Sequence, residues 1–227
     1  MKPSPHAPPL HGSLPPEGAG PPWERPGGGP FIYLASQSPR RKQLLEQWGV
    51  RCELLLPDAD EDSEALEVVK PNEPPSRYVQ RVTRLKLEAA VDRLKRRGLP
   101  LAPVLCADTT VAMGRDILGK PESAAHARRM LAQLSGHKHQ VLTAVAVAHK
   151  GQVFAALSRS SVVFADMKPA EIARYVASGE PMGKAGAYAI QGRSGAWTQH
   201  IDGSYSGIMG LPLFETAELL KPLGWAF

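Results

Sequence analysis

The hydrophobic and polar positions of the chain follow two different periods, and this predicts a fold that contains both strands and helices. Apolar runs at 31–36 and 52–56 predict strands, while the residues between them, 39–48, repeat their apolar positions at helical spacing. A longer helix is predicted at about 74–97, because an apolar stripe recurs there at spacings of three and four. The first half of the chain therefore predicts the order strand, helix, strand, helix.

Strands dominate the middle of the chain. The run 100–107 predicts a buried strand that ends before Asp108, and 111–118 resembles a hairpin. Two further β-rich runs, 139–148 and 153–164, are separated by a Lys-Gly turn, which predicts an antiparallel pair. Further helices are expected at 123–134, 169–178 and 212–220. Strands interleaved with helices in this way predict an α/β fold.

Residues 1–30 differ in composition from the rest of the chain. They hold ten prolines and six glycines with almost no β-branched residue. Such a segment cannot bury enough apolar surface to offset the entropy that is lost on ordering. We therefore expect a disordered Pro/Gly-rich leader at 1–30 and a domain at 31–227.

The net charge of +5 points to an anionic partner. Much of the positive excess lies in residues 77–97, without interleaved aromatic side chains, so a solvated helix face explains it better than nucleic-acid binding. A polyanionic small molecule would use the same charge. The composition therefore argues against nucleic acid as the partner and leaves a charged metabolite open.

The two cysteines, Cys52 and Cys106, lie in separate strand-like runs without CxxC spacing, which argues against a disulfide framework and a zinc site. We expect them to be core thiols in a reducing cytoplasm. No run approaches the roughly 20 apolar residues that cross a bilayer. The expected localisation is cytoplasmic, with no membrane partner.

A phosphate-binding turn is predicted at Ser36 to Arg41. Pro39 suits the first position of a helix because its missing N–H would be unpaired there, and Ser38 before it is a good N-cap. The free N–H groups and the positive dipole end of this helix, together with Arg40 and Arg41, favour an anion such as phosphate.

Candidate catalytic groups are spread along the chain. Asp108 follows a buried strand, where α/β domains often carry catalytic groups, although a simple turn former fits the same pattern. The acidic turn at 58–62 is either a solvated loop or a source of Mg²⁺ ligands. Lys86 lies one step off the apolar stripe of its helix, so its ammonium could reach a cleft or snorkel to solvent. Lys120 offers a point charge beside Gly119, which permits close backbone approach.

Five segments of the chain stand out together. They are Ser36-Gln37-Ser38-Pro39-Arg40-Arg41, Ala107-Asp108-Thr109, Gly119-Lys120-Pro121, Lys184 to Gly192, and Met209-Gly210-Leu211-Pro212. In this order and spacing they resemble the signature of the Maf family of nucleoside-triphosphate pyrophosphatases, over residues 31 to about 222. The resemblance implies an inosine-triphosphatase-like α/β fold, with a long mixed sheet flanked by helices and a cleft between two lobes. It also implies hydrolysis between the α and β phosphates, which gives a nucleoside monophosphate and pyrophosphate.

The resemblance further implies the residues of the site. Asp108 matches the family's proposed proton acceptor, and Glu61, Lys86 and Lys120 match cleft positions associated with metal or phosphate. Glu61 and Asp108 would hold the divalent cation, Mg²⁺ or Mn²⁺. The residues expected to bind substrate are Ser36, Ser38, Arg40, Arg41, Thr109, Lys184 and Gln191.

Three of these positions separate the substrate classes of the family. Arg40, Thr109 and Gln191 resemble the subfamily that acts on dTTP and UTP, whereas the 7-methyl-GTP subfamily carries tryptophan, glutamine and glutamate there. The Gln191 amide could donate to a pyrimidine carbonyl and accept from N3–H. Gly183 departs from the pattern, since many relatives carry an acidic residue there, and weaker metal binding would follow if that acid is a ligand. A homodimer would be typical of the fold.

A second functional class stays open beside this one. A nucleotide- or nucleic-acid-binding regulator of cell division is historically attached to the family through inhibition of septum formation, and the basic helix at 77–97 would carry that role. Scattered acidic residues and the missing aromatic platform argue against it. The leading hypothesis is a house-cleaning hydrolase of dTTP, UTP and modified pyrimidine triphosphates.

Overall fold

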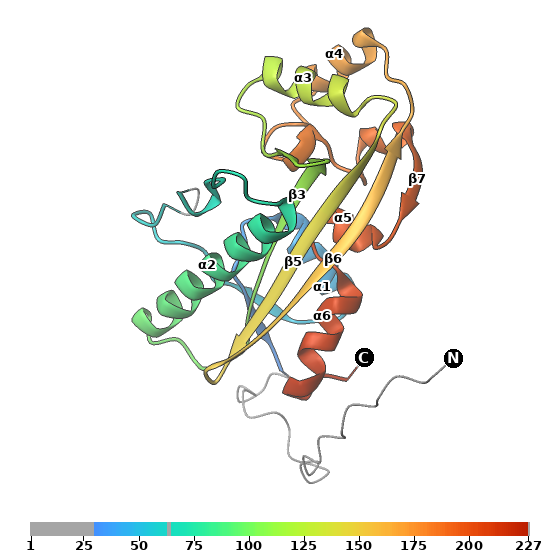
Figure 1. Cartoon of the computed structure of the whole chain (residues 1–227). Coiled ribbons are helices and arrows are strands. Elements are labelled where there is room, and N and C mark those ends of the chain that lie inside the picture. Colours follow the sequence, from blue (N-terminus) through green and yellow to red (C-terminus); the bar gives the residue numbers. More distant parts are fainter. Residues whose placement is uncertain (1–29, 63–64, 227) are drawn as a thin grey trace, which may run out of the picture.

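A computed structural model describes residues 30–62 and 65–226 of the chain. The leader expected at 1–30 thus lies, except for Pro30, outside the described residues. In the described part, one sheet is flanked by helices (Figure 1). The strands are β1 (Ile32–Leu34), β2 (Cys52–Leu54), β3 (Val104–Met113), β4 (Asp116–Leu118), β5 (Lys138–His149), β6 (Gln152–Phe164) and β7 (Thr198–Asp202). Their order is β2-β1-β3-β5-β6-β7, with β4 also paired to β3.

The sheet is mixed, as the resemblance implies. β1 runs parallel to β2 and to β3, while β3, β5, β6 and β7 pair antiparallel in sequence. The β5–β6 pair extends from Lys138 opposite Val163 to His149 opposite Gln152. The predicted antiparallel pair is therefore confirmed, and it forms the long spine of the molecule.

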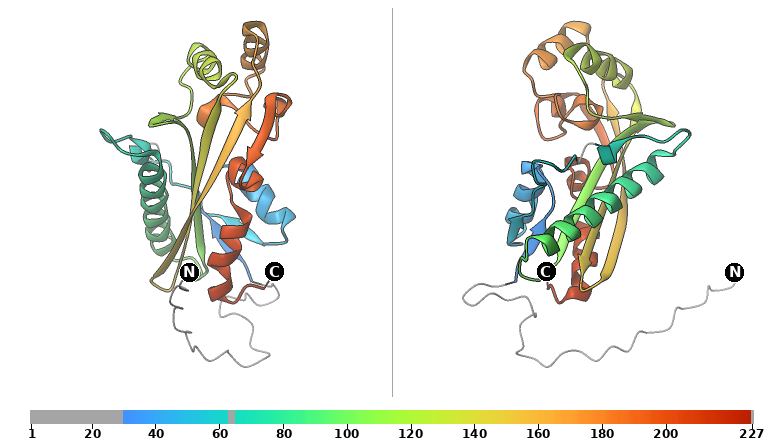
Figure 2. Two further views of the ribbon diagram at one scale, coloured as in Figure 1. Left: turned by 45° about the vertical axis from the view of Figure 1, so that its right-hand side comes forward. Right: turned by 90° about the vertical axis from the view of Figure 1, so that its left-hand side faces the viewer.

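Helices cover both faces of this spine. They are α1 (Pro39–Gln47), α2 (Pro75–Arg96), α3 (Ala124–Leu134), α4 (Pro169–Ala177), α5 (Tyr205–Met209) and α6 (Leu213–Leu220), with 3-10 turns at Ala65–Glu67, Ala185–Ala187, Arg193–Trp197 and Lys221–Leu223. α2 lies on one face of the long strands, and α1 and α6 lie on the other (Figure 2). α3 and α4 pack together at one end of the sheet. The α/β class is confirmed.

Two main hydrophobic cores lie along the long strands. One gathers around β1, the first half of β3, α1 and α6, and includes the fully buried side chains of Tyr33, Leu45 and Leu105. The other lies between α3, α4 and the far halves of β3 and β6, and includes Leu131 and Phe164. Because each core is built from its own helices, the molecule has two lobes that share β3, β5 and β6.

An opening between the lobes follows from the strand register. β1 accompanies β3 only as far as Leu34 opposite Leu105, and β4 joins the same edge of β3 at Val111 opposite Leu118. Between these points, the described ladders pair β3 only with β5. Asp108 lies in this gap, opposite Ala144 and in the middle of β3.

The prediction that the strand ends before Asp108 is therefore wrong. Thr109, Thr110 and Val111 are β-branched, so they favour extended backbone and continue the strand. The sequence also gave no sign of β7, α5 or the 3-10 turn at Ala65–Glu67. Each of these is five residues or shorter, too short to show a clear period.

Candidate active site

The gap beside β3 opens into a cleft with a volume of ≈ 800 Å³ that is lined from both lobes. In the part of the chain that the structure describes, its charged lining consists of six basic residues, Arg40, Arg41, Lys86, Arg93, Lys120 and Lys184, and four acidic residues, Glu61, Asp62, Glu67 and Asp108. The excess of positive charge suits a ligand that carries several negative charges. Among the substrate-binding predictions, Ser36, Ser38, Thr109 and Gln191 also line this cleft.

The turn before α1 forms an anion cradle, by which we mean Ser36 to Arg41. Pro39 occupies the first turn of α1, as predicted. The prediction that the Ser38 side chain caps the helix is wrong, because that side chain makes no capping bond. Instead the Ser38 backbone N–H donates to Ser36 Oγ over 3.2 Å. The Ser38 hydroxyl is thereby left at the cleft surface.

The two arginines of the cradle have different surroundings. Arg41 donates from Nε to the Gly210 carbonyl over 2.7 Å, from Nη1 to Ser36 Oγ over 3.0 Å, and from Nη2 toward Thr109 Oγ1 over 3.4 Å. Among the described residues, the Arg40 side chain makes one hydrogen bond, from Nε to the Met209 carbonyl over 3.3 Å. Arg41 therefore braces the cradle, and the Arg40 guanidinium is the group that can turn to a ligand.

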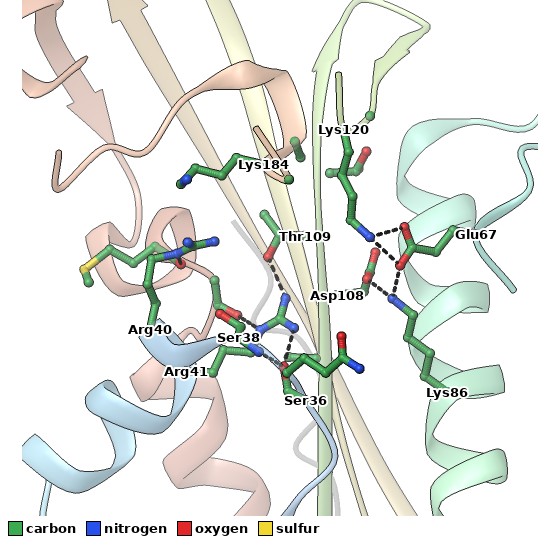
Figure 3. Close-up of a pocket in the computed structure, with 18 of the residues that line it drawn as sticks. Ser36, Ser38, Arg40, Arg41, Glu67, Lys86, Asp108, Thr109, Lys120 and Lys184 are labelled. Atoms are coloured by element: carbon green, nitrogen blue, oxygen red, sulfur yellow. Dashed lines mark hydrogen bonds and ion pairs between the residues drawn. The ribbon is translucent and has the colours of Figure 1, made fainter. Parts of the chain in front are cut away.

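Arg40 lies near Lys184 on the same side of the cleft (Figure 3). Within the described residues, neither side chain forms an ion pair with a carboxylate. Burial and the neighbouring Arg41 lower the pKa of Arg40, and burial and Arg40 lower the pKa of Lys184. Two cations that destabilise each other in this way favour an anion between them.

A cluster of two carboxylates and two lysines lies on the opposite wall of the cleft (Figure 3). Lys86 Nζ lies 2.6 Å from Asp108 Oδ1 and 2.7 Å from Glu67 Oε1. Lys120 Nζ lies 3.0 Å from Glu67 Oε2. We call these four residues the carboxylate–lysine cluster. It draws on β3, α2, the Ala65–Glu67 turn and the loop after β4, so distant segments converge here.

The charges of the cluster stabilise one another against burial. Burial opposes the ionised form of Glu67, but Lys86 and Lys120 outweigh it, so the pKa of Glu67 lies below its usual value. Burial also opposes the charged form of Lys86, but Asp108 and Glu67 outweigh it and raise the pKa of Lys86. Both groups are therefore ionised at neutral pH.

Glu67 was missed by the sequence argument. Its backbone carbonyl accepts a hydrogen bond from Tyr78 Oη over 2.9 Å, and the next carbonyl, that of Val68, accepts from Arg81 Nη2 over 2.9 Å. Arg81 is itself held by Glu73, with Nε to Oε1 at 2.6 Å. α2 thus fixes the segment that carries Glu67. The glutamate lies too far from Lys86 and Lys120 in the sequence for a local motif to reveal it.

Glu61 lines the cleft, as expected, but its carboxylate is paired with arginines of α2. Its carboxylate forms an ion pair with the buried Arg93, whose side chain is 4% exposed, and Glu61 Oε1 also lies 2.6 Å from Arg96 Nη2. The hydrogen bond from Arg93 is the main cause that lowers the pKa of Glu61 to about 2. The structure thus places Glu67, and not Glu61, beside Lys86 and Lys120.

The basic helix that would carry nucleic-acid binding is α2, and its charges are largely paired. Arg81, Arg84, Arg93 and Arg96 each form an ion pair with a glutamate, as shown by N–O separations of 3.0 Å or less. Arg97 pairs with Asp58. Paired cations release few counterions on binding a phosphate backbone. The described residues therefore offer little support for the nucleic-acid alternative.

Gln191 lies on a separate turn in the lobe that holds α3 and α4, which we call the upper lobe and its core the upper core. Gly192 N donates to the Ala189 carbonyl over 2.8 Å, and the buried Ser194 Oγ donates to the same carbonyl over 2.7 Å. The exposed Gln191 side chain is at the apex of this turn and lines the cleft. The neighbouring segment is tied to the Lys120 loop, because Gly186 N donates to the Gly119 carbonyl over 3.1 Å.

Comparison with known proteins accounts for this convergence. The family model described as Maf-like protein matches residues 31–223. The chain belongs to the Maf family. All five signature segments fall within the matched range, and the cleft of this Maf-like chain is lined from each of them.

Curated relatives cover nearly the same part of this Maf-like chain. The dTTP/UTP pyrophosphatase of Albidiferax ferrireducens is 65% identical over 195 residues, 86% of this chain and 98% of the relative. That of Polaromonas sp. is 66% identical over 194 residues, 86% and 96% of the two chains. Among solved structures, the Staphylococcus aureus Ham1 protein matches with a TM-score of 0.41 and 16% identity, over 61% of this chain and 73% of that one. A likeness at that level carries no conclusion here.

The helices of the described residues were also compared with the length and apolarity that a bilayer requires. None of those in 30–62 and 65–226 meets both conditions.

Proposed function

We propose that this protein hydrolyses pyrimidine nucleoside triphosphates, dTTP and UTP, to the nucleoside monophosphate and pyrophosphate. The observation that carries the proposal is the pairing of two sites across one cleft. Arg40 and Lys184 lie on one wall without carboxylate partners in the described residues, and the carboxylate–lysine cluster lies on the other. Relatives that are 65% and 66% identical are named for this activity.

The phosphate chain would bind between the two walls. The free N–H groups at the start of α1 and the Ser38 hydroxyl offer hydrogen bonds to phosphate oxygens, and Arg40 and Lys184 offer charge. Arg41 keeps the cradle in shape through its bonds to Gly210 and Ser36. In this arrangement substrate binding relieves the mutual repulsion of Arg40 and Lys184.

The hydrolytic step would use the carboxylate–lysine cluster. A water attacks phosphorus, a new P–O bond forms, and the bridging P–O bond between the α and β phosphates breaks. Asp108 accepts the proton of that water. Lys86 and Lys120 are already held in place by Glu67, so they stabilise the charge that develops on the phosphoryl oxygens without further reorganisation.

The cluster also fits a divalent cation. Asp108 and Glu67 present carboxylate oxygens to the same part of the cleft, and Mg²⁺ and Mn²⁺ prefer oxygen ligands from one or two carboxylates with phosphate completing the shell. The described residues hold no group of three or more His, Cys, Asp or Glu side chains placed to bind a metal. We propose Asp108 and Glu67 as the two protein ligands of the cation, with Glu67 in place of Glu61, because these two carboxylates both contact Lys86 and lie close together. When bound, such a cation neutralises charge on the phosphates.

Base selection would rest on the upper lobe. Gln191 lies at the apex of its turn and lines the cleft, and its amide can both donate and accept, as a pyrimidine edge requires. Thr109 supports the choice indirectly, since its hydroxyl is held by Thr143 Oγ1 at 2.9 Å and by Arg41. A larger residue at 109 would displace Arg41 from the cradle.

A nucleotide panel tests the proposal. Wild-type protein is incubated with Mg²⁺ and each of dTTP, UTP, CTP, GTP and 7-methyl-GTP, and pyrophosphate and orthophosphate are measured separately. We expect pyrophosphate from dTTP and UTP at rates above those for the other nucleotides. Orthophosphate as the product would overturn the reaction class, and equal rates for all five would overturn the proposed base selection.

A further inference from the structure

A carboxylate outside the carboxylate–lysine cluster supports the turn that carries Gln191. Glu180 follows α4, and its Oε1 accepts two hydrogen bonds, from Tyr175 Oη over 3.0 Å and from the Arg193 backbone N–H over 3.0 Å. Tyr175 is buried in the upper core, where its ring packs edge-on against Trp197 at 5.1 Å. The carboxylate therefore links a rigid helix to the far side of the Gln191 turn.

The fit around this carboxylate is close. A Cβ atom built on Gly192 would lie 2.1 Å from Glu180 Oε1 and 2.8 Å from its Cδ. No side chain is compatible with that separation unless the carboxylate moves. Gly192 is thus glycine because Glu180 occupies the space of a side chain, and the turn and the carboxylate interlock.

The same residue holds Lys184 through its backbone. Lys184 Nζ donates to the Glu180 carbonyl and, over 3.4 Å, to the Met182 carbonyl. Glu180 therefore contacts both parts of the cleft wall in the upper lobe, the turn of Gln191 through its side chain and the ammonium of Lys184 through its main chain. In this way Glu180 contributes to the separation between the groups proposed for the base and for the phosphates.

We propose that Glu180 is a positioning residue that fixes the Gln191 turn relative to Lys184 and thereby sets the discrimination between nucleobases. This proposal rests on the proposed function, in which Gln191 contacts the base. Glu180 touches neither substrate nor the carboxylate–lysine cluster. It acts by limiting the places that Gln191 can occupy while Lys184 holds the phosphates.

Three substitutions separate this role from a merely structural one. Glu180→Ala removes both accepted bonds, Glu180→Asp keeps the charge but withdraws the oxygen, and Glu180→Gln keeps an oxygen that can accept from both donors. Glu218→Ala is the matched control, because Glu218 is an exposed glutamate whose partner, Lys221, lies on the surface away from the cleft. Affinities for UTP and GTP are measured by calorimetry with Ca²⁺ in place of Mg²⁺, and kcat and KM are measured with Mg²⁺.

We expect the ratio of UTP to GTP affinity to fall about tenfold in Glu180→Ala and Glu180→Asp, which corresponds to the loss of about one or two hydrogen bonds' worth of positioning. KM for UTP should rise by the same factor with kcat changed less than about threefold, since the cluster is untouched. Glu180→Gln and the control should keep the wild-type ratio. If Glu180→Ala does not fold, Glu180→Asp carries the test.

The inference about Glu180 would be overturned if its substitution changed stability and left nucleobase discrimination unchanged. A lower Tm with an unchanged affinity ratio in Glu180→Ala or Glu180→Asp would assign Glu180 a purely structural role and overturn the inference. The proposed function fails separately, if wild-type protein releases no pyrophosphate from any triphosphate. Because affinity is measured without turnover, the two failures are distinguishable.

Discussion

Replacing each of the two candidate glutamates, Glu67 and Glu61, by glutamine gives the sharpest structural prediction. Glu67→Gln removes a negative charge from between Lys86 and Lys120 while it keeps the shape of the side chain. Glu61→Gln removes the partner of the buried Arg93. The two variants should therefore separate activity from stability.

The magnitudes follow from the contacts that each change removes. Glu67 makes charge-assisted bonds to two lysines, at 2.7 Å and 3.0 Å, and each such bond is worth about 1.5–3 kcal/mol. If one of these bonds contributes to stabilising the transition state, kcat of Glu67→Gln should fall about 100-fold, since each 1.36 kcal/mol is about tenfold in rate. Glu61→Gln removes one partner of a buried ion pair, and such a loss costs about 3–5 kcal/mol of folding free energy.

That cost is reduced at Glu61. Arg93 keeps its bond to the Leu55 carbonyl at 2.9 Å, and the Glu61 side chain is 21% exposed. We therefore expect Glu61→Gln to destabilise the protein by about 2 kcal/mol, which lowers Tm by about 4–8 °C for a chain of this size. Its kcat at 25 °C should stay within about threefold of wild type.

Pyrophosphate release and thermal unfolding are measured on both variants, with Glu88→Gln as control, since Glu88 forms an exposed pair with Arg84 on α2. A 100-fold loss of kcat in Glu61→Gln with an unchanged Tm would refute this reasoning. So would a fully active Glu67→Gln.

Three further predictions concern the cradle, the metal and acid. Arg40→Met should raise KM for UTP about tenfold with little change in Tm. Arg41→Met should lower Tm by about 4–8 °C, since it loses the bonds that brace the cradle. Steady-state kinetics and calorimetric melting check both variants, and the reverse pattern would contradict the assignment. Lys86→Met should bind Mn²⁺ more tightly than wild type in titrations without nucleotide, because the ammonium lies between the two carboxylates of the cluster, and equal or weaker binding would count against a site there. The pKa of Glu61 is about 2 against an ordinary 4.5, so the stabilisation that its ion pair gives is complete above about pH 5 and is lost as the pH falls toward 2. In urea unfolding, the free energy of unfolding of wild type should fall by about 1 kcal/mol more than that of Glu61→Gln between pH 5 and 3. Equal losses in the two proteins would show that the pair contributes nothing.

The cradle could be predicted from the sequence because its geometry is local. A strand, a proline at the first turn of a helix and adjacent arginines lie within ten residues. A rotation of about 100° between successive helix positions directs Arg40 and Arg41 to different sides of α1. Which of them braces the cradle could not be predicted, because that depends on Gly210, 169 residues away, and on Thr109, 68 residues away.

The choice between Glu61 and Glu67 was beyond the sequence for the same reason. Several carboxylates follow one another in the acidic turn, and nothing local distinguishes one that pairs with an arginine from one that faces a cleft. The arginine that binds Glu61 is Arg93, 32 residues further along on α2. The resemblance pointed to Glu61 in the acidic turn at 58–62, whereas the structure places Glu67, beyond that turn, beside Lys86 and Lys120.

The extent of β3 shows a limit of a different kind. A strand that runs into Asp108-Thr109-Thr110 is compatible with a turn or with continued extension, because aspartate favours turns while the β-branched threonines favour extended backbone. The pairing of Asp108 with Ala144 on β5 decides the matter. Because that partner is itself part of a long antiparallel pair, the decision is tertiary.

The identity of the products formed from UTP tests the central claim most directly. Wild-type protein and Asp108→Asn are incubated with UTP and Mg²⁺, and UMP, UDP, pyrophosphate and orthophosphate are quantified by ion-exchange chromatography. We predict equal amounts of UMP and pyrophosphate from wild type and a rate at least about 100-fold lower from Asp108→Asn. Formation of UDP with orthophosphate, or full activity of Asp108→Asn, would contradict the proposed site.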